Sequence, residues 1–295
     1  MTRIAESELI LNSDGSIFHL HLKPEMVSDI IILVGDQDRV QLISQFFDKI
    51  EYKIKNREFV THTGSYKGRR ISIISTGIGT DNIDIVVNEV DALFNVDLKT
   101  RKVKEEKTVL NFIRIGTSGA IQEDIEIDKP IISEYAIGFD NVLWFYKTNK
   151  IKSTVNRALE KKFMEHTNWR NLLSRPYFIR SSQKLLDIIG KDMRKGTTIS
   201  SSGFYGPQGR AIRLQTYDPD LNKKITSFRD ERIDRITNYE MESSAIYSLS
   251  RLLGHNAVTV CQIISNRITK EYSQDYKPAM KKLFINVLDR LSTIQ

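Results

Sequence analysis

Two arginines follow short apolar runs, each close to a glycine. Arg39 comes shortly after Gly35, and Arg114 stands just before Gly116 and Thr117. Glycine lets backbone N–H groups approach an anion, arginine offers paired planar donors, and the threonine hydroxyl adds another donor. These positions predict a site for an oxyanion such as phosphate, although a tight turn with a surface ion pair would explain either arginine alone.

Two glutamates flank a methionine at the predicted start of a helix. They are Glu240 and Glu242, with Met241 between them, and the segment that follows is apolar. Acids near a helix N-terminus are stabilised by the helix dipole, so the pair has a purely structural explanation. The functional alternative is that one carboxylate accepts hydrogen bonds from neighbouring hydroxyls of a sugar while Met241 lies against the ring.

A third group of residues lies in a loop rich in glycine and proline. Phe204, Gln208 and Arg210 occur there within a short span. An aromatic face can lie against a flat ring, and a glutamine that both donates and accepts can read the edge of a nucleobase. Arg210 would oppose negative charge that develops on that base. The alternative is a surface loop whose polar residues have no common function.

The residues of these three groups must be positioned by strands and helices, which the periodicity of apolar residues predicts. Apolar runs of strand length alternate with longer segments of helical period, which predicts an α/β fold. Ligands of such folds collect at the carboxyl ends of the strands, where the glycine-bearing turns would lie. Gly77 and Gly79 lack the third glycine of a dinucleotide-binding loop, so a Rossmann dehydrogenase is excluded.

The expected strands are Ile30–Val34, Phe59–Tyr66, Arg70–Ser75, Val109–Ile115, Pro130–Ile137, Thr197–Ser201 and Ala257–Ser265. The expected helices follow Gly35-Asp36 and span about Asp81–Phe94, capped by Thr80 or Asp81, then Met241–Leu253 and Ala279–Ile294. The charged run Leu98–Lys107 predicts a solvated surface insertion. The segment Phe139–Arg180 shows no steady period and stays unassigned.

The composition is that of a folded globular protein. The chain has 295 residues, 40% hydrophobic and 27% charged, and no interdomain linker is evident, so we expect a single domain over 1–295. A net charge of +7 is thinly spread for a nucleic-acid binder but suits an anionic small molecule. The lone Cys261 and the absence of a leader or membrane-spanning run predict a cytoplasmic protein with no nucleic-acid or membrane partner.

Taken together, the motifs resemble the hexameric nucleoside phosphorylases, and within them the members that act on uridine. The resemblance implies a mixed, partly barrel-like central sheet flanked by helices, with probable insertions near 98–107 and 139–180. It also implies a homo-oligomer, either a dimer or a hexamer built as three dimers. The resembling blocks occur in the family's order at Ser16–Leu20, Val34–Arg39, Arg57–Phe59, Ser75–Gly79, Arg114–Gln122, Phe204–Arg210, Tyr239–Ser243 and Ile264–Arg267.

The resemblance implies roles for individual residues in three subsites, with Arg114, Arg210 and Glu242 as the catalytic set. The phosphate subsite would hold Gly35, Arg39, Arg114 and Thr117, with Arg57 supplied by a neighbouring subunit. The ribose subsite would hold Met241 and Glu242, with His19 from the same neighbour. The base subsite would hold Phe204, Gln208, Arg210, Ile264 and Ser265.

The implied reaction is reversible phosphorolysis of uridine to uracil and ribose 1-phosphate, with inorganic phosphate as co-substrate. We expect no cofactor and no metal. Two positions depart from the family's pattern. Gln37 replaces the usual proline after Gly-Asp, and Asn82 stands where relatives have a serine near a monovalent-cation site. The second departure weighs against that cation site even though Glu58 is retained.

Three rival functions fit the sequence less well. A purine nucleoside phosphorylase of the same fold would resemble its relatives in carrying an aspartate that protonates the purine, where this chain has Asn266, which cannot act as a general acid. A hydrolytic nucleosidase would not need several phosphate-binding arginines. A catalytically silent nucleoside-binding protein would be expected to lose part of the site, whereas Arg39, Arg114 and Glu242 are all present.

Overall fold

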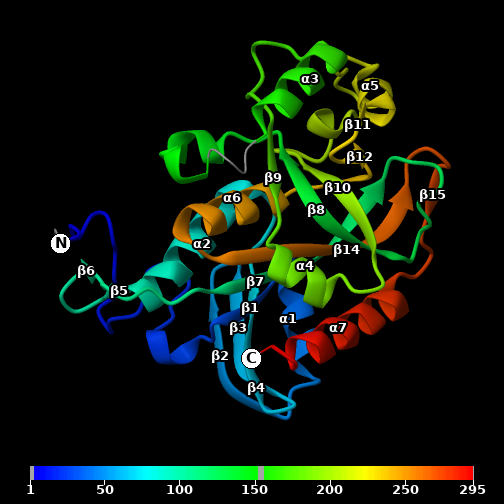
Figure 1. Cartoon of the computed structure of the whole chain (residues 1–295). Helices are drawn as coiled ribbons and strands as arrows, with labels where there is room; N and C mark the ends of the chain where they lie inside the picture. The colour runs from blue at the N-terminus through cyan, green and yellow to red at the C-terminus, as the bar shows by residue number, and fades with distance from the viewer. Residues whose placement is uncertain (1–2, 152–155, 295) are drawn as a thin grey trace.

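The computed structural model describes residues 3–151 and 156–294, which build one large sheet flanked by helices on both faces (Figure 1). The strands follow the order β15-β14-β8-β10-β13-β7-β1-β4-β3-β2, and β9 pairs with β8. A further pairing between β14 and β7 closes five of these strands into a barrel-like ring. The α/β fold with a partly barrel-like mixed sheet is therefore confirmed.

The strands of the ring carry most of the candidate site. They are β7 (Asn111–Ala120), β8 (Pro130–Gly138), β10 (Arg194–Ser200), β13 (Asn238–Glu240) and β14 (Asn256–Asn266). The first half of β7 pairs in parallel with β1, and its last residues pair with β13. Because it pairs along its length with β14 as well, β7 joins the open sheet to the ring.

The open part of the sheet extends from β7 to a charged edge. It contains β1 (Ile30–Val34), β4 (Arg69–Ser75), β3 (Phe59–Tyr66) and β2 (Lys49–Asn56). Every residue of β1 is buried, whereas exposed and half-buried residues alternate along β2. The remaining strands are short: β5 (Val96–Asp97), β6 (Lys102–Val103), β9 (Tyr177–Arg180), β11 (Arg229–Asp230), β12 (Asp234–Arg235) and β15 (Glu271–Tyr272).

Helices cover both faces of the sheet and one end of the ring. One apolar core includes residues of α2 (Thr80–Asn95) and α6 (Ser243–Leu253), and a second includes those of α1 (Gln37–Ser44), α4 (Gln183–Ile189) and α7 (Lys277–Leu291). A third core lies beneath α3 (Arg157–Thr167) and α5 (Leu221–Ser227) at the top of Figure 1. No helix in residues 3–151 and 156–294 is long and apolar enough to cross a bilayer.

Most predicted strands are confirmed, but the assignment around Arg114 is wrong. The sequence predicts a strand that ends at Ile115 followed by a glycine-bearing turn, whereas β7 continues to Ala120. Gly116 and Gly119 lie within the strand, where it passes from β1 to β13. Glycine is typical of strands that bend at a barrel corner, so these two glycines serve curvature and close packing instead of a turn.

Two helix starts also differ from prediction. The helix expected from Met241 begins at Ser243, and Asn238–Glu240 forms β13, because pairing with β10 overrides the local helical pattern. The helix expected to be capped by Thr80 or Asp81 has Gly79 at its N-cap and no side-chain cap.

The two segments expected as insertions have different structures. The charged run 98–107 is mostly exposed and contains the turn and second strand of the β5–β6 hairpin, which agrees with a solvated surface segment. Within 139–180, the described residues form two single-turn helices (Val142–Phe145 and Thr148–Ile151), α3 and β9. Residues 152–155 of this segment lie outside the described part of the chain.

Candidate active site

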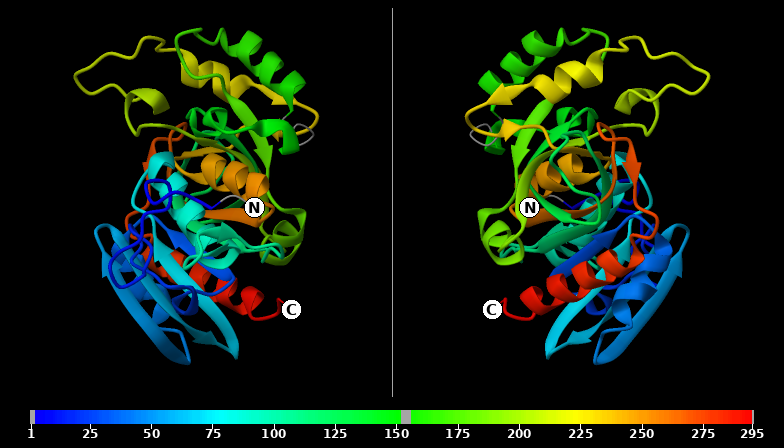
Figure 2. Two further views of the ribbon diagram at one scale, coloured as in Figure 1. Left: turned by 90° about the vertical axis from the view of Figure 1, so that its left-hand side faces the viewer. Right: turned by 90° about the vertical axis from the view of Figure 1, so that its right-hand side faces the viewer.

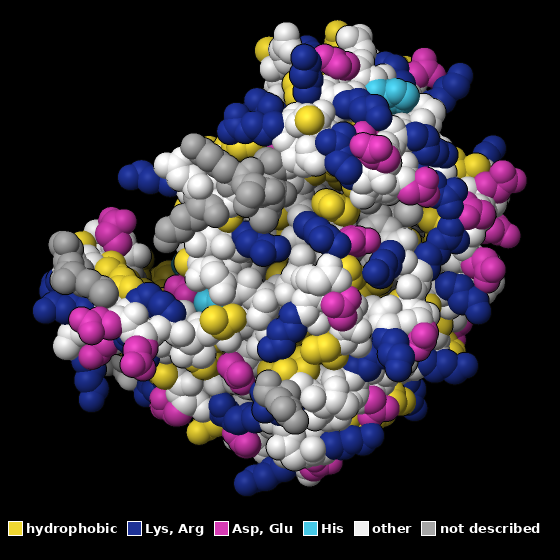
Figure 3. Space-filling model, viewed as in Figure 1, with side chains coloured by type: hydrophobic (Ala, Val, Ile, Leu, Met, Phe, Trp, Pro, Cys, Tyr) yellow, Lys and Arg dark blue, Asp and Glu magenta, His cyan; other side chains and the backbone are white. Residues whose placement is uncertain are grey.

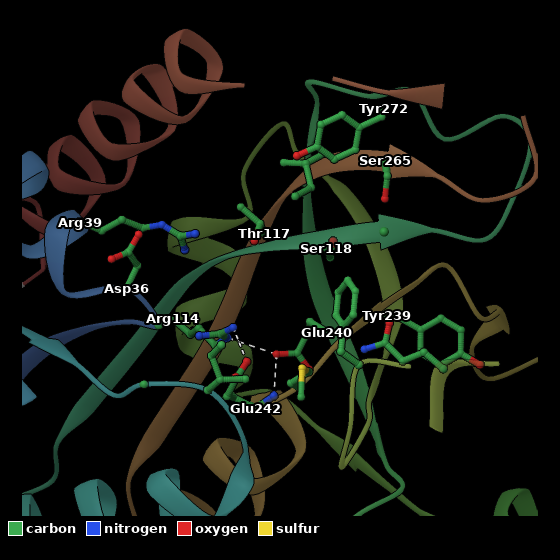
Figure 4. Close-up of a pocket in the computed structure, with 18 of the residues that line it drawn as sticks. Asp36, Arg39, Arg114, Thr117, Ser118, Tyr239, Glu240, Glu242, Ser265 and Tyr272 are labelled. Carbon is green, nitrogen blue, oxygen red and sulfur yellow. Dashed lines mark hydrogen bonds and ion pairs between the residues drawn. The ribbon is translucent and has the colours of Figure 1, made fainter. Parts of the chain in front are cut away.

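A pocket of about 1320 Å³ lies where the ends of β1, β7, β13 and β14 approach one another (Figure 4). It brings together all the site residues expected from the sequence except His19 and Arg57. Its wall includes Gly35, Arg39, Arg114, Thr117, Phe204, Gln208, Arg210, Met241, Glu242, Ile264 and Ser265.

Arg114 lies between two buried carboxylates at the floor of the pocket. Its Nε donates to Glu240 Oε2 at 3.1 Å, and its Nη2 forms a short ion pair with Glu242 Oε2. Burial alone would lower the pKa of Arg114, but the two carboxylates outweigh it and raise that pKa above the ordinary value. The guanidinium is therefore a permanent cation in a fixed orientation.

The two glutamates are not equivalent. Glu240 accepts hydrogen bonds from Arg114, from the Ser200 hydroxyl and from the backbone N–H groups of Glu242 and Ser243, so its oxygens are occupied within the protein. Glu242 lines the pocket and accepts only from Arg114 and, at 2.8 Å, from the N–H of Gly79 among the described residues. Both glutamates line the pocket, but Glu242 has fewer partners within the protein, so it is the carboxylate with more capacity to accept hydrogen bonds from a ligand.

Burial raises the pKa of Glu242 to about 7, and the nearby charge of Arg114 works against this rise. Its usual value is 4.5, so this carboxylate changes charge within the physiological range instead of in acid. The hydrogen bond from Gly79, at the N-cap of α2, also favours the ionised form. Glu242 is thus an acceptor whose charge depends on pH near neutrality.

Two guanidinium groups at one end of the pocket keep donors for an anion. Arg114 Nη1 is buried and has no hydrogen-bond partner in the described structure. Burial, and the nearby charge of Arg114, lower the pKa of Arg39. Figure 4 shows the Arg39 side chain directed toward the strand that bears Thr117. A buried donor without a partner costs free energy, and an oxyanion between these groups would remove that cost.

At the opposite end of the pocket, three of the residues expected to bind the base are in contact. Arg210 Nη1 donates to the Phe204 carbonyl at 2.7 Å and to Gln208 Oε1, and the guanidinium lies 4.0 Å from the centre of the Phe204 ring. Gln208 is buried, and Phe204 is about half exposed. Burial and the charge of Arg267 lower the pKa of Arg210 to about 10, so this cation is held in a partly desolvated place.

Two further pocket residues were not singled out from the sequence. Tyr239 lies on β13 beside Glu240, and Arg267 stacks on its ring at 5.3 Å. Arg267 Nη1 is buried without a hydrogen-bond partner in the described structure. Both residues belong to sequence blocks that resemble the family, Tyr239–Ser243 and Ile264–Arg267. Their position beside the predicted site residues was therefore the signal that could have identified them.

The side-chain amide of Asn266 is hydrogen-bonded within the protein at both its nitrogen and its oxygen. Its Nδ2 donates to the carbonyls of Gln122 and Ile125 at 2.9 and 2.8 Å, and its Oδ1 accepts from the N–H groups of Ile268 and Thr269. The side chain therefore holds the turn that follows β14. An amide fixed in this way has no proton to give to a leaving group.

His19 and Arg57 lie together on another surface, outside the wall of the pocket. Arg57 is exposed and stacks over the Phe18 ring at 5.4 Å, and that ring meets the His19 ring edge-on at 4.9 Å. His19 Nδ1 is 2.6 Å from Glu89 Oε1. The chain's own pocket does not use either residue, which leaves both available to a neighbouring chain.

Glu58 and Asn82, the two residues weighed for a cation site, both line the pocket. Asn82 Nδ2 lies 2.5 Å from where a Cβ on Gly77 would be, so the amide packs against that glycine. Within residues 3–151 and 156–294, no group of three or more His, Cys, Asp or Glu side chains is arranged to hold a metal ion.

Comparison with known proteins gives a consistent result. The family profile of the phosphorylase superfamily matches residues 29–292. A uridine phosphorylase of Thermococcus kodakarensis is 30% identical over 92% of this chain and 85% of its own length. A DeoD-type purine nucleoside phosphorylase of Brevibacillus brevis is 28% identical over 86% and 88%. A Trypanosoma brucei nucleoside phosphorylase, described as showing uridine phosphorylase activity, superposes with a TM-score of 0.87 at 30% identity, covering 97% and 100%.

Proposed function

Because the chain belongs to the phosphorylase superfamily, we propose that it is a uridine phosphorylase, a pentosyltransferase that reversibly converts uridine and phosphate to uracil and ribose 1-phosphate. The observation that carries the proposal is the pocket itself. It places unpartnered arginine donors at one end, the pH-sensitive carboxylate of Glu242 near its floor, and the Gln208–Arg210 pair at the other end.

Phosphate occupies the cationic end of the pocket in this proposal. Arg114 Nη1 and the Arg39 guanidinium bind its oxygens, with Thr117 and the Gly35 backbone as further donors. Glu240 holds Arg114 in place through Nε. A nucleophile held in this orientation attacks the anomeric carbon without the entropy cost of a random encounter.

Ribose lies between the two ends. Glu242 in its ionised form accepts hydrogen bonds from the ribose hydroxyls, and Met241 packs against the sugar. Breaking the glycosidic bond leaves positive charge on the sugar and negative charge on the departing base. The bound phosphate and Glu242 stabilise the first of these charges.

The negative charge on the departing base is stabilised at the opposite end of the pocket. Gln208 and Arg210 bind the edge of uracil, with Phe204 against the ring and Ile264 and Ser265 lining the cavity. The pKa of Arg210 is about 10, so it is still a cation at neutral pH. A cation already in place where charge develops lowers the barrier without reorganisation.

Uridine is favoured over a purine nucleoside by the last residue of β14. The pocket has Asn266 there, and its amide is fixed by four backbone groups. Protonation of a leaving purine by that residue is therefore not possible, whereas a uracil anion needs only Gln208 and Arg210. Purine nucleoside phosphorylase of the same fold stays the second candidate because DeoD-type enzymes are among the relatives.

Several finer assignments belong to the same proposal. The enzyme acts in pyrimidine salvage in the cytoplasm, as a single domain over 1–295 with insertions near 98–107 and 139–180. It works as a homo-oligomer, a dimer or a hexamer, in which His19 and Arg57 complete the neighbouring pocket. The contact of both residues with Phe18, away from their own pocket, supports this exchange.

The test is a cleavage screen over uridine, thymidine, cytidine, inosine and adenosine, with and without phosphate. We expect release of uracil from uridine that depends on phosphate. Equal cleavage without phosphate would identify a hydrolase, and faster cleavage of inosine would identify a purine enzyme. Binding without cleavage of any nucleoside would favour the silent binding protein.

A further inference from the structure

Asn222, the second residue of α5, contacts two walls of the pocket. Its Nδ2 donates to the carbonyl of Gln208 at 3.0 Å, and its Oδ1 accepts from the Tyr239 hydroxyl at 2.9 Å. Asn222 does not itself line the pocket. Its amide therefore joins the base-reading loop to β13, the strand that leads into Met241 and Glu242.

The base-reading loop, residues 202–210, has few other ties to the protein. Its remaining hydrogen bonds in the described structure are internal, as from Gln208 N and Arg210 N to the Tyr205 carbonyl. Figure 2 shows the yellow-green segment between β10 and α5 projecting from the body of the molecule. Among the described residues, the bond from Asn222 to Gln208 is thus the loop's one hydrogen bond to another element.

Gly209 shows how closely this amide packs against the loop. Its φ is +68°, and a Cβ built there would lie 2.2 Å from Asn222 Nδ2. A side chain at position 209 would be strained and would displace Asn222. In the same loop, a Cβ on Gly206 would meet no atom within 4 Å and one on Gly203 would meet Pro207, so the close contact with Asn222 belongs to the residue beside Gln208.

We infer that Asn222 is a positioning residue for base recognition, an inference that rests on the proposed function. Asn222 fixes the position of Gln208 relative to Met241 and Glu242, the residues proposed to bind ribose. Gln208 can read a base edge only if its donor and acceptor are held in register with the sugar. Uridine and cytidine differ in the donors and acceptors on that edge, so loss of register weakens both uridine binding and the preference for uridine.

The decisive variants are Asn222→Ala and Asn222→Asp. The aspartate keeps an oxygen for the Tyr239 hydroxyl but has no N–H for the Gln208 carbonyl, so both variants lose the tie to the loop. We expect the KM for uridine to rise about five- to tenfold in each, the effect of one lost neutral hydrogen bond, and the uridine-to-cytidine preference to fall by a similar factor. The KM for phosphate should stay within about twofold, because the phosphate end lies on other elements.

Ile225→Val is the matched control on the same helix. It trims a buried side chain of α5 without touching the amide, so it should lower Tm and leave both KM values and the preference unchanged. The glycine pair gives a second approach. Gly209→Ala should reproduce the Asn222→Ala phenotype, and Gly206→Ala should show a clearly smaller shift.

Uracil binding by calorimetry separates this inference from the proposed function. A wild-type chain that binds uracil but cleaves no uridine would overturn the function, and the uracil Kd of the variants would then decide the role of Asn222. An unchanged uridine KM and uracil Kd in Asn222→Ala would overturn the inference. So would an equal rise in the phosphate KM, or the same selectivity loss in Ile225→Val.

Discussion

At the scale of single residues, the acidity of Glu242 should make nucleoside binding depend on pH near neutrality. Burial raises the pKa of this carboxyl to about 7, so it is ionised above that pH and neutral below it. Ribose hydroxyls donate best to the ionised form. The Kd for uridine, measured without phosphate, should therefore weaken as pH falls below 7, approaching about tenfold per pH unit.

Omitting phosphate keeps the titration of that co-substrate out of the measurement. Glu242→Gln should bind uridine weakly at every pH and give a flat profile, because the titrating group is gone. A wild-type Kd that stays constant between pH 8 and pH 5.5 would rule out this role for Glu242.

Arg210 should act mainly on the transition state. Negative charge reaches the base only as the glycosidic bond breaks, so Arg210→Ala should lower kcat and kcat/KM together, by about a hundred- to a thousandfold. Arg213→Ala removes an exposed arginine three residues further on and is the matched control. If Arg210→Ala raised KM alone, Arg210 would merely help substrate bind.

Residue types predicted much of this site, but not the partition of roles between neighbouring residues. Arg39, Arg114, Gln208 and Arg210 were identified because their chemistry suits phosphate and a nucleobase, and the resemblance selected Glu242 from the glutamate pair. The sequence could not show that Ser200 and Ser243 occupy Glu240, because Ser200 comes from another strand. Asn222 was equally hidden, since its bonds to Gln208 and Tyr239 exist only after α5 docks.

At the scale of elements, β7 couples backbone packing to the phosphate site. The Arg114 side chain extends along its own strand toward Gly116. A Cβ on Gly116 would lie 3.0 Å from Arg114 Nη2 and 3.2 Å from Cys261 Sγ on the neighbouring strand β14. Gly116→Ala should therefore shift the guanidinium by a few tenths of an ångström and raise the KM for phosphate by about tenfold.

Thermal unfolding distinguishes the two contacts that Gly116→Ala would crowd. A raised phosphate KM with a nearly unchanged Tm means that Arg114 moves. A lowered Tm with an unchanged phosphate KM would mean that Cys261 and β14 absorb the clash instead, and the predicted link between β7 curvature and phosphate binding would then be wrong.

Strands were predictable where consecutive residues of one segment are all buried. The five residues of β1 are buried on both faces, and the apolar run gave both ends of the strand. β2 went unpredicted although Ile50, Tyr52 and Ile54 alternate with charged residues in the period of a half-buried strand, because most of the predicted strands rest on continuous apolar runs. The segment 139–180 depends on long-range aromatic packing, such as Phe139 against Trp169, which no local period reveals.

At the scale of the whole molecule, the placement of His19 and Arg57 predicts a shared active site. Arg57→Ala should cripple phosphate use and Glu242→Ala should cripple ribose binding, so each homo-oligomer alone should be nearly inactive. In a mixed two-fold pair, one pocket receives both lesions and the other receives neither. Co-refolding the two variants in equal amounts should restore about a quarter of wild-type activity if pairing is random.

Native mass spectrometry would confirm that subunits exchanged in this mixture. If mixed oligomers form and no activity returns, Arg57 serves its own chain or has no part in catalysis. A control mixture of Glu242→Ala with Arg210→Ala should stay inactive, because both lesions lie in the chain's own pocket and every site keeps one of them.

The distribution of charged side chains over the surface is also a property of the whole molecule. On the face shown in Figure 3, basic and acidic side chains are interspersed, without one large patch of either sign. The net charge of +7 therefore does not gather on this face into the continuous basic surface that a nucleic-acid backbone would require.

The edge strand β2 limits how copies of this chain can come together. Lys49, Lys53 and Lys55 are exposed along β2, at one end of the sheet. An open edge offers unpaired N–H and C=O groups to strands of other molecules, which is how amorphous or fibrous aggregation starts, and lysines on the edge oppose it. Copies should therefore associate through side-chain surfaces instead of by extending the sheet. Neutralising these lysines, as exhaustive acetylation does, should make concentrated solutions of the folded protein prone to precipitation.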